Sequence, residues 1–147
     1  MFLSSRKRIL KDMVMLILIF SLSASACYAG ALRKALEKWR PAGLRGLIME
    51  VSHGGHYIIV NEKKVVLVNT HLNKRTYKTQ VMDIDGRKLG WGALTKGREV
   101  LVKGSAVFTK GDGIEILAKY IYILPRRTTR SQGVKVKEIL RRAPTPW

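Results

Sequence analysis

The chain has 147 residues and a formal net charge of +18, from 28 Lys and Arg against 10 Asp and Glu. This length accommodates one folded domain, and an apolar content of 46% excludes a wholly disordered chain. The single cysteine excludes an internal disulfide framework.

Residues 1–26 have the order of a secretory signal: basic residues, the apolar run 13–20, and then small residues. The apolar run is shorter than the ~20 residues of a membrane-spanning helix, so we predict cleavage rather than a retained anchor. Small residues permit cleavage before Cys27 or before Gly30. A lipoprotein would be acylated at Cys27, but Ala24 stands where such proteins usually have Leu. We expect a bacterial protein of the periplasm or cell envelope, with a lipid anchor at Cys27 as the alternative.

Residues 27–43 contain a predicted short amphipathic helix. Leu32, Ala35, Leu36 and Trp39 have the spacing of one helix face, and Pro41 ends the helix because proline lacks the backbone donor. We expect this apolar face to cover an open end of the following domain. The alternative is that the basic helix lies on an anionic membrane surface.

Residues 44–124 change to a period of two, which predicts β-structure. Strands are expected at 44–51, 57–61, 64–70, 99–108 and 114–124, with a tight return at Glu62 and Lys63 and an additional extended run at 77–85. Along the last strand, Ile114, Ile116, Ala118, Tyr120, Tyr122 and Leu124 are expected on one face. The predicted fold is mainly β: a small five-stranded OB-like barrel with a short N-terminal helix and a basic C-terminal tail.

Five short patterns carry a resemblance to a known class of domain. Three of them are Gly46-x-Ile48, the run Leu94-x-x-Gly97-x-x-Val100-x-Val102-x-Gly104, and Ile116-x-Ala118-x-x-Ile121. With Ile59-x-Asn61 and Val66-x-Val68-x-Thr70, they resemble small secreted bacterial OB-fold domains of unknown function. The resemblance covers 44–124 and implies a binding or structural module rather than an enzyme.

Residues 125–147 form a basic tail with a net charge of +6, equal to that of residues 44–124. Its composition predicts a flexible segment, with a docked strand or helix as the alternative. Its cations would attract an anionic membrane surface or another envelope polyanion, and Trp147 could enter the interface. The alternative is that the tail only keeps the protein soluble and binds no partner. The cations are Arg126, Arg127, Arg130, Lys135, Lys137, Arg141 and Arg142.

No residue pattern predicts catalysis, a metal site or a cofactor. His53, His56 and His71 lack the spacing of a zinc site and are interpreted as polar turn residues. Asp83, Asp85 and Asp112 are interpreted as turn residues, because two of them precede glycine. No small-molecule substrate is identified.

A second basic surface is predicted near the second and third strands. OB-folds bind single-stranded nucleic acid where cations follow the phosphates and aromatic rings stack on the bases. The sequence therefore predicts a non-catalytic module with an anionic envelope partner, and single-stranded nucleic acid is the alternative partner. The residues of this surface are Tyr57, Lys63, Lys64, Lys74, Arg75, Tyr77, Lys78 and Trp91.

Overall fold

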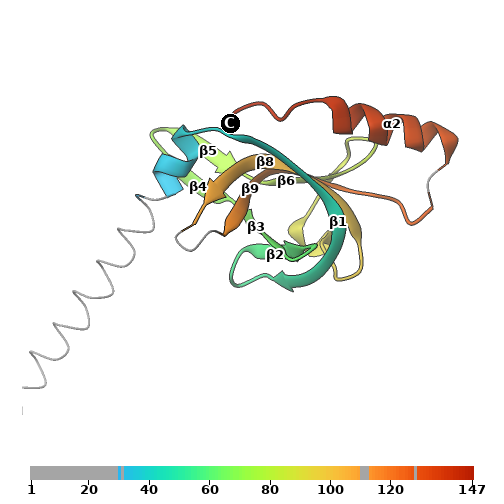
Figure 1. Cartoon of the computed structure of the whole chain (residues 1–147), viewed down its shortest axis with the longest axis horizontal. Helices are drawn as coiled ribbons and strands as arrows, with labels where there is room; N and C mark the ends of the chain where they lie inside the picture. The colour runs from blue at the N-terminus through green and yellow to red at the C-terminus, as the bar shows by residue number, and fades with distance from the viewer. Residues whose placement is uncertain (1–29, 31, 110–112, 128) are drawn as a thin grey trace, which may run out of the picture. The chain divides into compact units, whose positions relative to one another are not determined.

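The computed structural model describes residues 30, 32–109, 113–127 and 129–147 (Figure 1). The chain divides into two compact units, one ending at Glu37 and one spanning Lys38–Trp147. In the first unit, residues 32–37 are helical as predicted, and Arg33 pairs with Glu37 one turn later at 3.0 Å. The predicted signal segment and Cys27 lie outside the described residues. Within the described ranges, no helix has the length and apolarity needed to cross a bilayer.

The second unit contains a closed five-stranded β-barrel, and one pair of its barrel strands is parallel (Figure 1). Strand β1 (Pro41–Ser52) pairs antiparallel with β2 (Tyr57–Val60) and β8 (Glu99–Phe108), β2 with β3 (Lys63–Leu67), and β8 with β9 (Ile114–Ile123). Strand β3 runs parallel to β9 and closes the ring, which confirms the predicted barrel. The described elements of this unit are β1 (Pro41–Ser52), β2 (Tyr57–Val60), β3 (Lys63–Leu67), β4 (Asn69–Leu72), β5 (Arg75–Lys78), β6 (Gln80–Asp83), β7 (Lys88–Leu89), the 3-10 turn η1 (Trp91–Ala93), β8 (Glu99–Phe108), β9 (Ile114–Ile123) and α2 (Arg130–Arg141).

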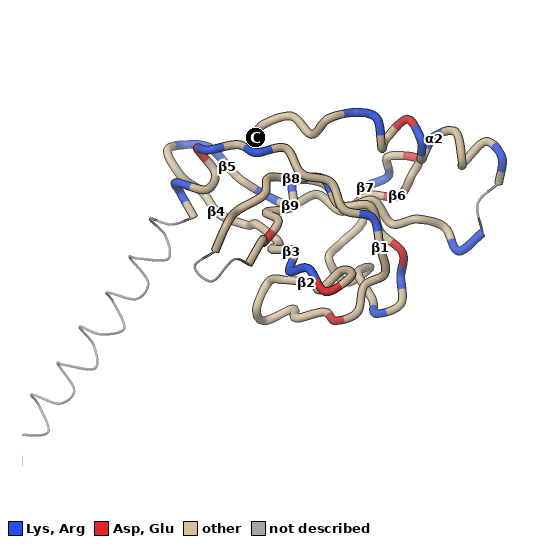
Figure 2. The backbone as a smooth tube through the Cα atoms, in the orientation of Figure 1, with Lys and Arg blue, Asp and Glu red and all other residues tan. Residues whose placement is uncertain are grey.

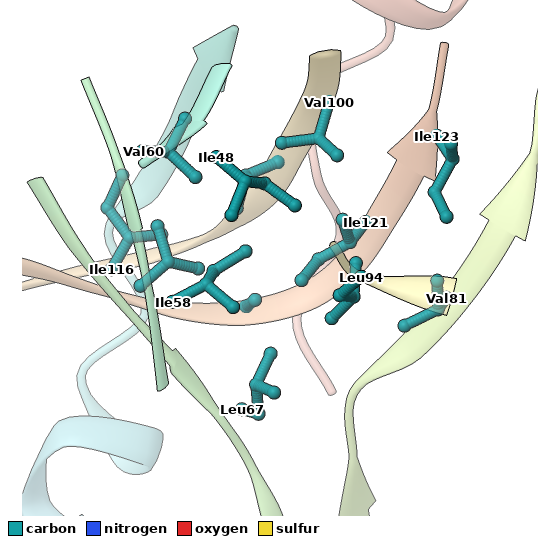
Figure 3. Packing of buried hydrophobic residues seen from close by; sticks show 13 residues of the cluster. Ile48, Ile58, Val60, Leu67, Val81, Leu94, Val100, Ile116, Ile121 and Ile123 are labelled. Atoms are coloured by element: carbon teal, nitrogen blue, oxygen red, sulfur yellow. The ribbon is translucent and has the colours of Figure 1, made fainter. Parts of the chain in front are cut away.

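Inward side chains of all five barrel strands form the hydrophobic core (Figure 3). Ile58, Val65 and Val100 have no exposed surface, and Leu94 adds a side chain from the loop after η1. Burial of branched apolar side chains from every strand is what holds a barrel of this size closed.

The turn between β2 and β3 ties this hairpin to β1. Asn61 and Glu62 both have positive φ angles, so the turn lies one residue earlier than the predicted position at Glu62 and Lys63. The Asn61 side chain accepts from Leu47 N at 3.2 Å and donates to Arg45 O at 3.2 Å. A Cβ on Gly46 would lie 2.3 Å from that amide, so glycine is needed for the close approach.

A β-bulge in β9 changes which of its residues point into the barrel. Lys103 pairs with Tyr120 and Gly104 with Ala118, which leaves Lys119 as the extra residue. The core therefore contains Ile116 and Ala118 before the bulge but Ile121 and Ile123 after it. The prediction of one continuous face was wrong beyond Ala118, because an extra residue reverses the alternation.

The segment between β3 and β8 forms a hairpin and an additional parallel strand. Strands β4 and β5 make a separate two-stranded sheet, while β6 pairs with the second half of β9. Buried Thr79 separates β5 from β6, since its Oγ1 accepts from Val68 N at 2.7 Å and donates to Ala118 O at 2.6 Å. The predicted strand 64–70 is consequently interrupted at Val68, and the run 77–85 is divided at Thr79.

Candidate ligand surfaces

The predicted basic surface is divided among three places in the fold. On the outside of β2 and β3, Tyr57 and Lys64 lie together, with the Lys64 ammonium 5.3 Å from the ring centroid. Both are engaged by acidic groups: Tyr57 donates to Glu50 at 3.2 Å, and Lys64 pairs with Glu115 at 2.9 Å. The charge of this pair is thus balanced locally, although Lys63 at the start of β3 is exposed.

The second place is the β4–β5 hairpin, which carries Lys74, Arg75, Tyr77 and Lys78. Lys74 has a φ angle of 62° in the tight turn, and the two cations that follow the turn are exposed. The Tyr77 ring contacts the ring of Trp147 edge-on at 5.8 Å. The Trp147 ring therefore covers part of the Tyr77 ring.

The third place is η1, where Trp91 is partly buried against the barrel core. Its indole N–H donates to Thr79 O at 3.2 Å, and its ring meets His56 edge-on at 5.5 Å. No ring contact joins Tyr57, Tyr77 and Trp91 among the described residues, so the three rings do not form one stacking platform.

The C-terminal tail is not the flexible arm predicted from composition, because residues 130–141 form helix α2. Its first turn has a capping box in which Thr129 Oγ1 accepts from Gln132 N and the Gln132 side chain accepts from Thr129 N. Val136 is only 6% exposed and joins Leu101 and Leu124 in a small core outside the barrel. The docked helix that was the alternative is therefore what the structure contains.

Buried Lys103 fixes the end of α2, and no sequence pattern predicted this role. Its ammonium donates to Leu140 O at 3.2 Å and to Arg142 O, both carbonyls at the C-terminus of the helix. A cation at this end complements the helix dipole. Removal from water lowers the pKa of Lys103.

Residues 143–147, the terminal segment, continue across the barrel after α2. Trp39 donates to Pro144 O at 3.2 Å, and Lys119 donates to Pro146 O at 2.7 Å. The bulge that inserts Lys119 thus supplies one of the side chains that hold this segment. The Trp147 indole N–H is buried and has no partner among the described residues.

The tail cations lie along α2 and the segment that leads to it (Figure 2). Lys135 pairs with Asp85 at 2.5 Å, and Arg142 pairs with Glu138. Hydrogen bonding to Lys135 lowers the pKa of Asp85. In the part of the chain that the structure describes, the remaining tail cations are exposed and have no ion pair: Arg126, Arg127, Arg130, Lys137 and Arg141.

The residues considered for metal or acid–base chemistry have other roles. Asp83 Oδ1 accepts from Asp85 N and Arg87 N, both at 2.9 Å, which is the turn role predicted for it. His71 Nδ1 lies 3.0 Å from Thr76 Oγ1. Among the described side chains, no three His, Cys, Asp or Glu residues gather in a metal-binding group, and Asp112 lies outside them.

No protein-family model matches the chain, and no curated protein matches it.

Proposed function

We propose that the protein is a non-catalytic binding module of the bacterial cell envelope, related to small secreted OB-fold domains, whose partner is an anionic surface. One observation carries the proposal: α2 presents exposed cations that have no ion pair with any residue the structure describes. Arg130, Lys137 and Arg141 recur at the i, i+7 and i+11 positions, with Val134 between them at 64% exposure. This spacing forms one solvent-facing stripe on a helix.

Because α2 is docked, the stripe should bind a partner more tightly than a flexible tail would. Val136 and Lys103 hold the helix in place, so little further ordering is needed when a partner binds. A cation near an anionic membrane surface contributes about 1 kcal/mol, so three give about 3 kcal/mol, or roughly 100-fold in affinity. Anionic lipid headgroups are the partner that a flat row of exposed cations fits best.

The test compares two triple substitutions in the full chain. Arg130, Lys137 and Arg141 are changed to Gln in one variant, and Lys63, Lys74 and Arg75 in the other. Both variants lose the same charge and keep the same N-terminal segment, so their difference reports the contribution of α2. Binding is measured to vesicles with and without anionic lipid over a salt series. We expect the α2 variant to lose up to about 100-fold and the control about 10-fold or less. Equal losses would contradict the proposal.

Single-stranded nucleic acid is the second candidate, favoured by the β4–β5 hairpin. Lys74, Arg75 and Lys78 lie on the same hairpin as Tyr77, and the described residues give them no acidic partner. For this candidate, the same two variants should reverse their order in oligonucleotide binding. If both bind oligonucleotides as the unchanged chain does, this candidate fails. Turnover that disappears in Asp83→Asn would instead contradict the non-catalytic assignment.

A further inference from the structure

A cleft of about 320 Å³ lies beside the barrel, and its lining residues do not include any from α2. Its walls are two short segments, residues 78–81 and 88–91, which the antiparallel pairing of Val81 with Leu89 brings together. The volume is at the lower end of the range for small-molecule sites. The lining residues are Lys78, Thr79, Gln80, Val81, Lys88, Leu89, Gly90 and Trp91.

The charge of the cleft is entirely positive. Lys78 and Lys88 are both exposed, and neither has an ion pair within the described ranges. Among the described residues, no acidic side chain lines the cleft, and the exposed Gln80 of the first segment adds an amide donor and acceptor. This arrangement suits a phosphate group that is bound by two separate ammonium groups.

Trp91 lines the cleft, and its ring is held in a fixed orientation. Its indole N–H is held by Thr79 O at 3.2 Å, and His56 contacts it edge-on. Leu89 is 38% exposed and adds apolar surface next to the ring. A planar ligand can stack on such a ring without the entropy cost of immobilising the Trp91 side chain.

We propose that this cleft binds a nucleoside phosphate, with the base against Trp91 and the phosphate between Lys78 and Lys88. The combination of an aromatic wall and two cations selects a ligand that is both planar and anionic. A free mononucleotide and the end of a single strand both carry this chemistry. The site is separate from α2 and does not depend on binding to an anionic surface.

The experiment follows the ¹H–¹⁵N spectrum of the full chain during titration with adenosine monophosphate. We expect saturable shifts of the Trp91 indole and of the amides of residues 88–91. Adenosine alone and inorganic phosphate alone should each bind at least about ten-fold more weakly, because each provides half of the contacts. A short oligoadenylate forms the second arm, and tighter binding than the mononucleotide would identify a strand end as the source.

Two lysine substitutions test the site without disturbing the core. Lys78→Gln and Lys88→Gln should each weaken binding of adenosine monophosphate about two- to five-fold, whereas Lys96→Gln should not. The triple Gln variant of α2 should retain this binding, which separates failure here from failure of the envelope proposal. Absence of shifts at millimolar nucleotide, equal binding of inorganic phosphate, or unchanged affinity in both lysine variants would overturn the inference.

Discussion

Two valines on α2 provide a direct test of how the helix docks. Val136 is 6% exposed and packs against Leu101 and Leu124, whereas Val134, two residues earlier, is 64% exposed. Val136→Ala and Val134→Ala make the same chemical change in the same helix. Any difference between the two variants therefore measures burial against the barrel.

The expected magnitude follows from the atoms removed. Replacing valine by alanine removes two carbons, and at about 0.8 kcal/mol for each buried carbon the loss at Val136 is about 1.6 kcal/mol. A residual cavity increases this cost, and the higher helix propensity of alanine offsets about 0.5 kcal/mol. Val136→Ala should destabilise the protein by about 1.5 kcal/mol. Val134→Ala should stabilise it by up to about 0.5 kcal/mol, because only the propensity changes.

Urea denaturation of both variants, followed by circular dichroism, gives the free energies of unfolding. Amide hydrogen exchange in residues 130–141 shows whether the loss is confined to α2. A difference of about 2 kcal/mol between the variants is expected. If the two valines give equal free energies and equal exchange rates, α2 does not pack on the barrel as described.

Three further predictions concern the barrel and its cation. Gly104→Ala would place a Cβ 2.0 Å from a backbone oxygen of β9, so it should lower the free energy of unfolding by about 2 kcal/mol or more. Gly43→Ala is the control, because its nearest atom would lie at 3.8 Å. In denaturant titrations it should change the free energy of unfolding by no more than about 0.5 kcal/mol. Thr79→Val keeps the shape but removes two buried hydrogen bonds, so we expect a loss of about 2 to 4 kcal/mol in the same assay; an unchanged midpoint would refute this. The pKa of Lys103 is lowered by burial, so near that pKa the unfolded chain binds more protons than the folded chain. The measured quantity is the difference in free energy of unfolding between the unchanged chain and Lys103→Met. This difference should rise with pH between the lowered pKa and 10.5, and a constant difference would contradict the desolvation of Lys103.

The barrel could be predicted because its strands alternate locally and its turns have strong residue signals. Glu99–Phe108 agrees with the expected bounds, and the neighbouring predictions differ by only a few residues. What the pattern could not give was the bulge at Lys119. Gly104 faces Leu117 and Ala118 across the strands, and their close approach is a tertiary feature with no period in the sequence.

The C-terminal helix shows a different reason for failure. Composition favoured disorder because Arg and Lys outnumber apolar residues there, yet Thr129 and Gln132 have the spacing of a capping box. That local signal could have located the helix start. Docking through Val136 depends on Leu101, which adjoins core residues of β8 but faces outward. The sequence alone does not say that an outward leucine has a partner.

The candidate site residues were identified as basic and aromatic but could not be assigned to places. Lys78 and Trp91 line one cleft, while Lys64 pairs with Glu115 and Tyr57 donates to Glu50. These pairings depend on strand register and on segments far apart in the chain. Residue type suggested the candidate chemistry, which stays a prediction, and only the fold shows which described cations have acidic partners.

The parallel pairing of β3 with β9 determines when the barrel can close. The meander of β1, β2 and β3 can form from local contacts, but its remaining edge is completed by the last strand of the chain. Contacts between distant segments form slowly, so the apolar inner face that contains Ile58 and Val65 stays open to solvent during folding. A chain interrupted before Ile114 therefore forms an open sheet prone to aggregation, rather than a smaller barrel.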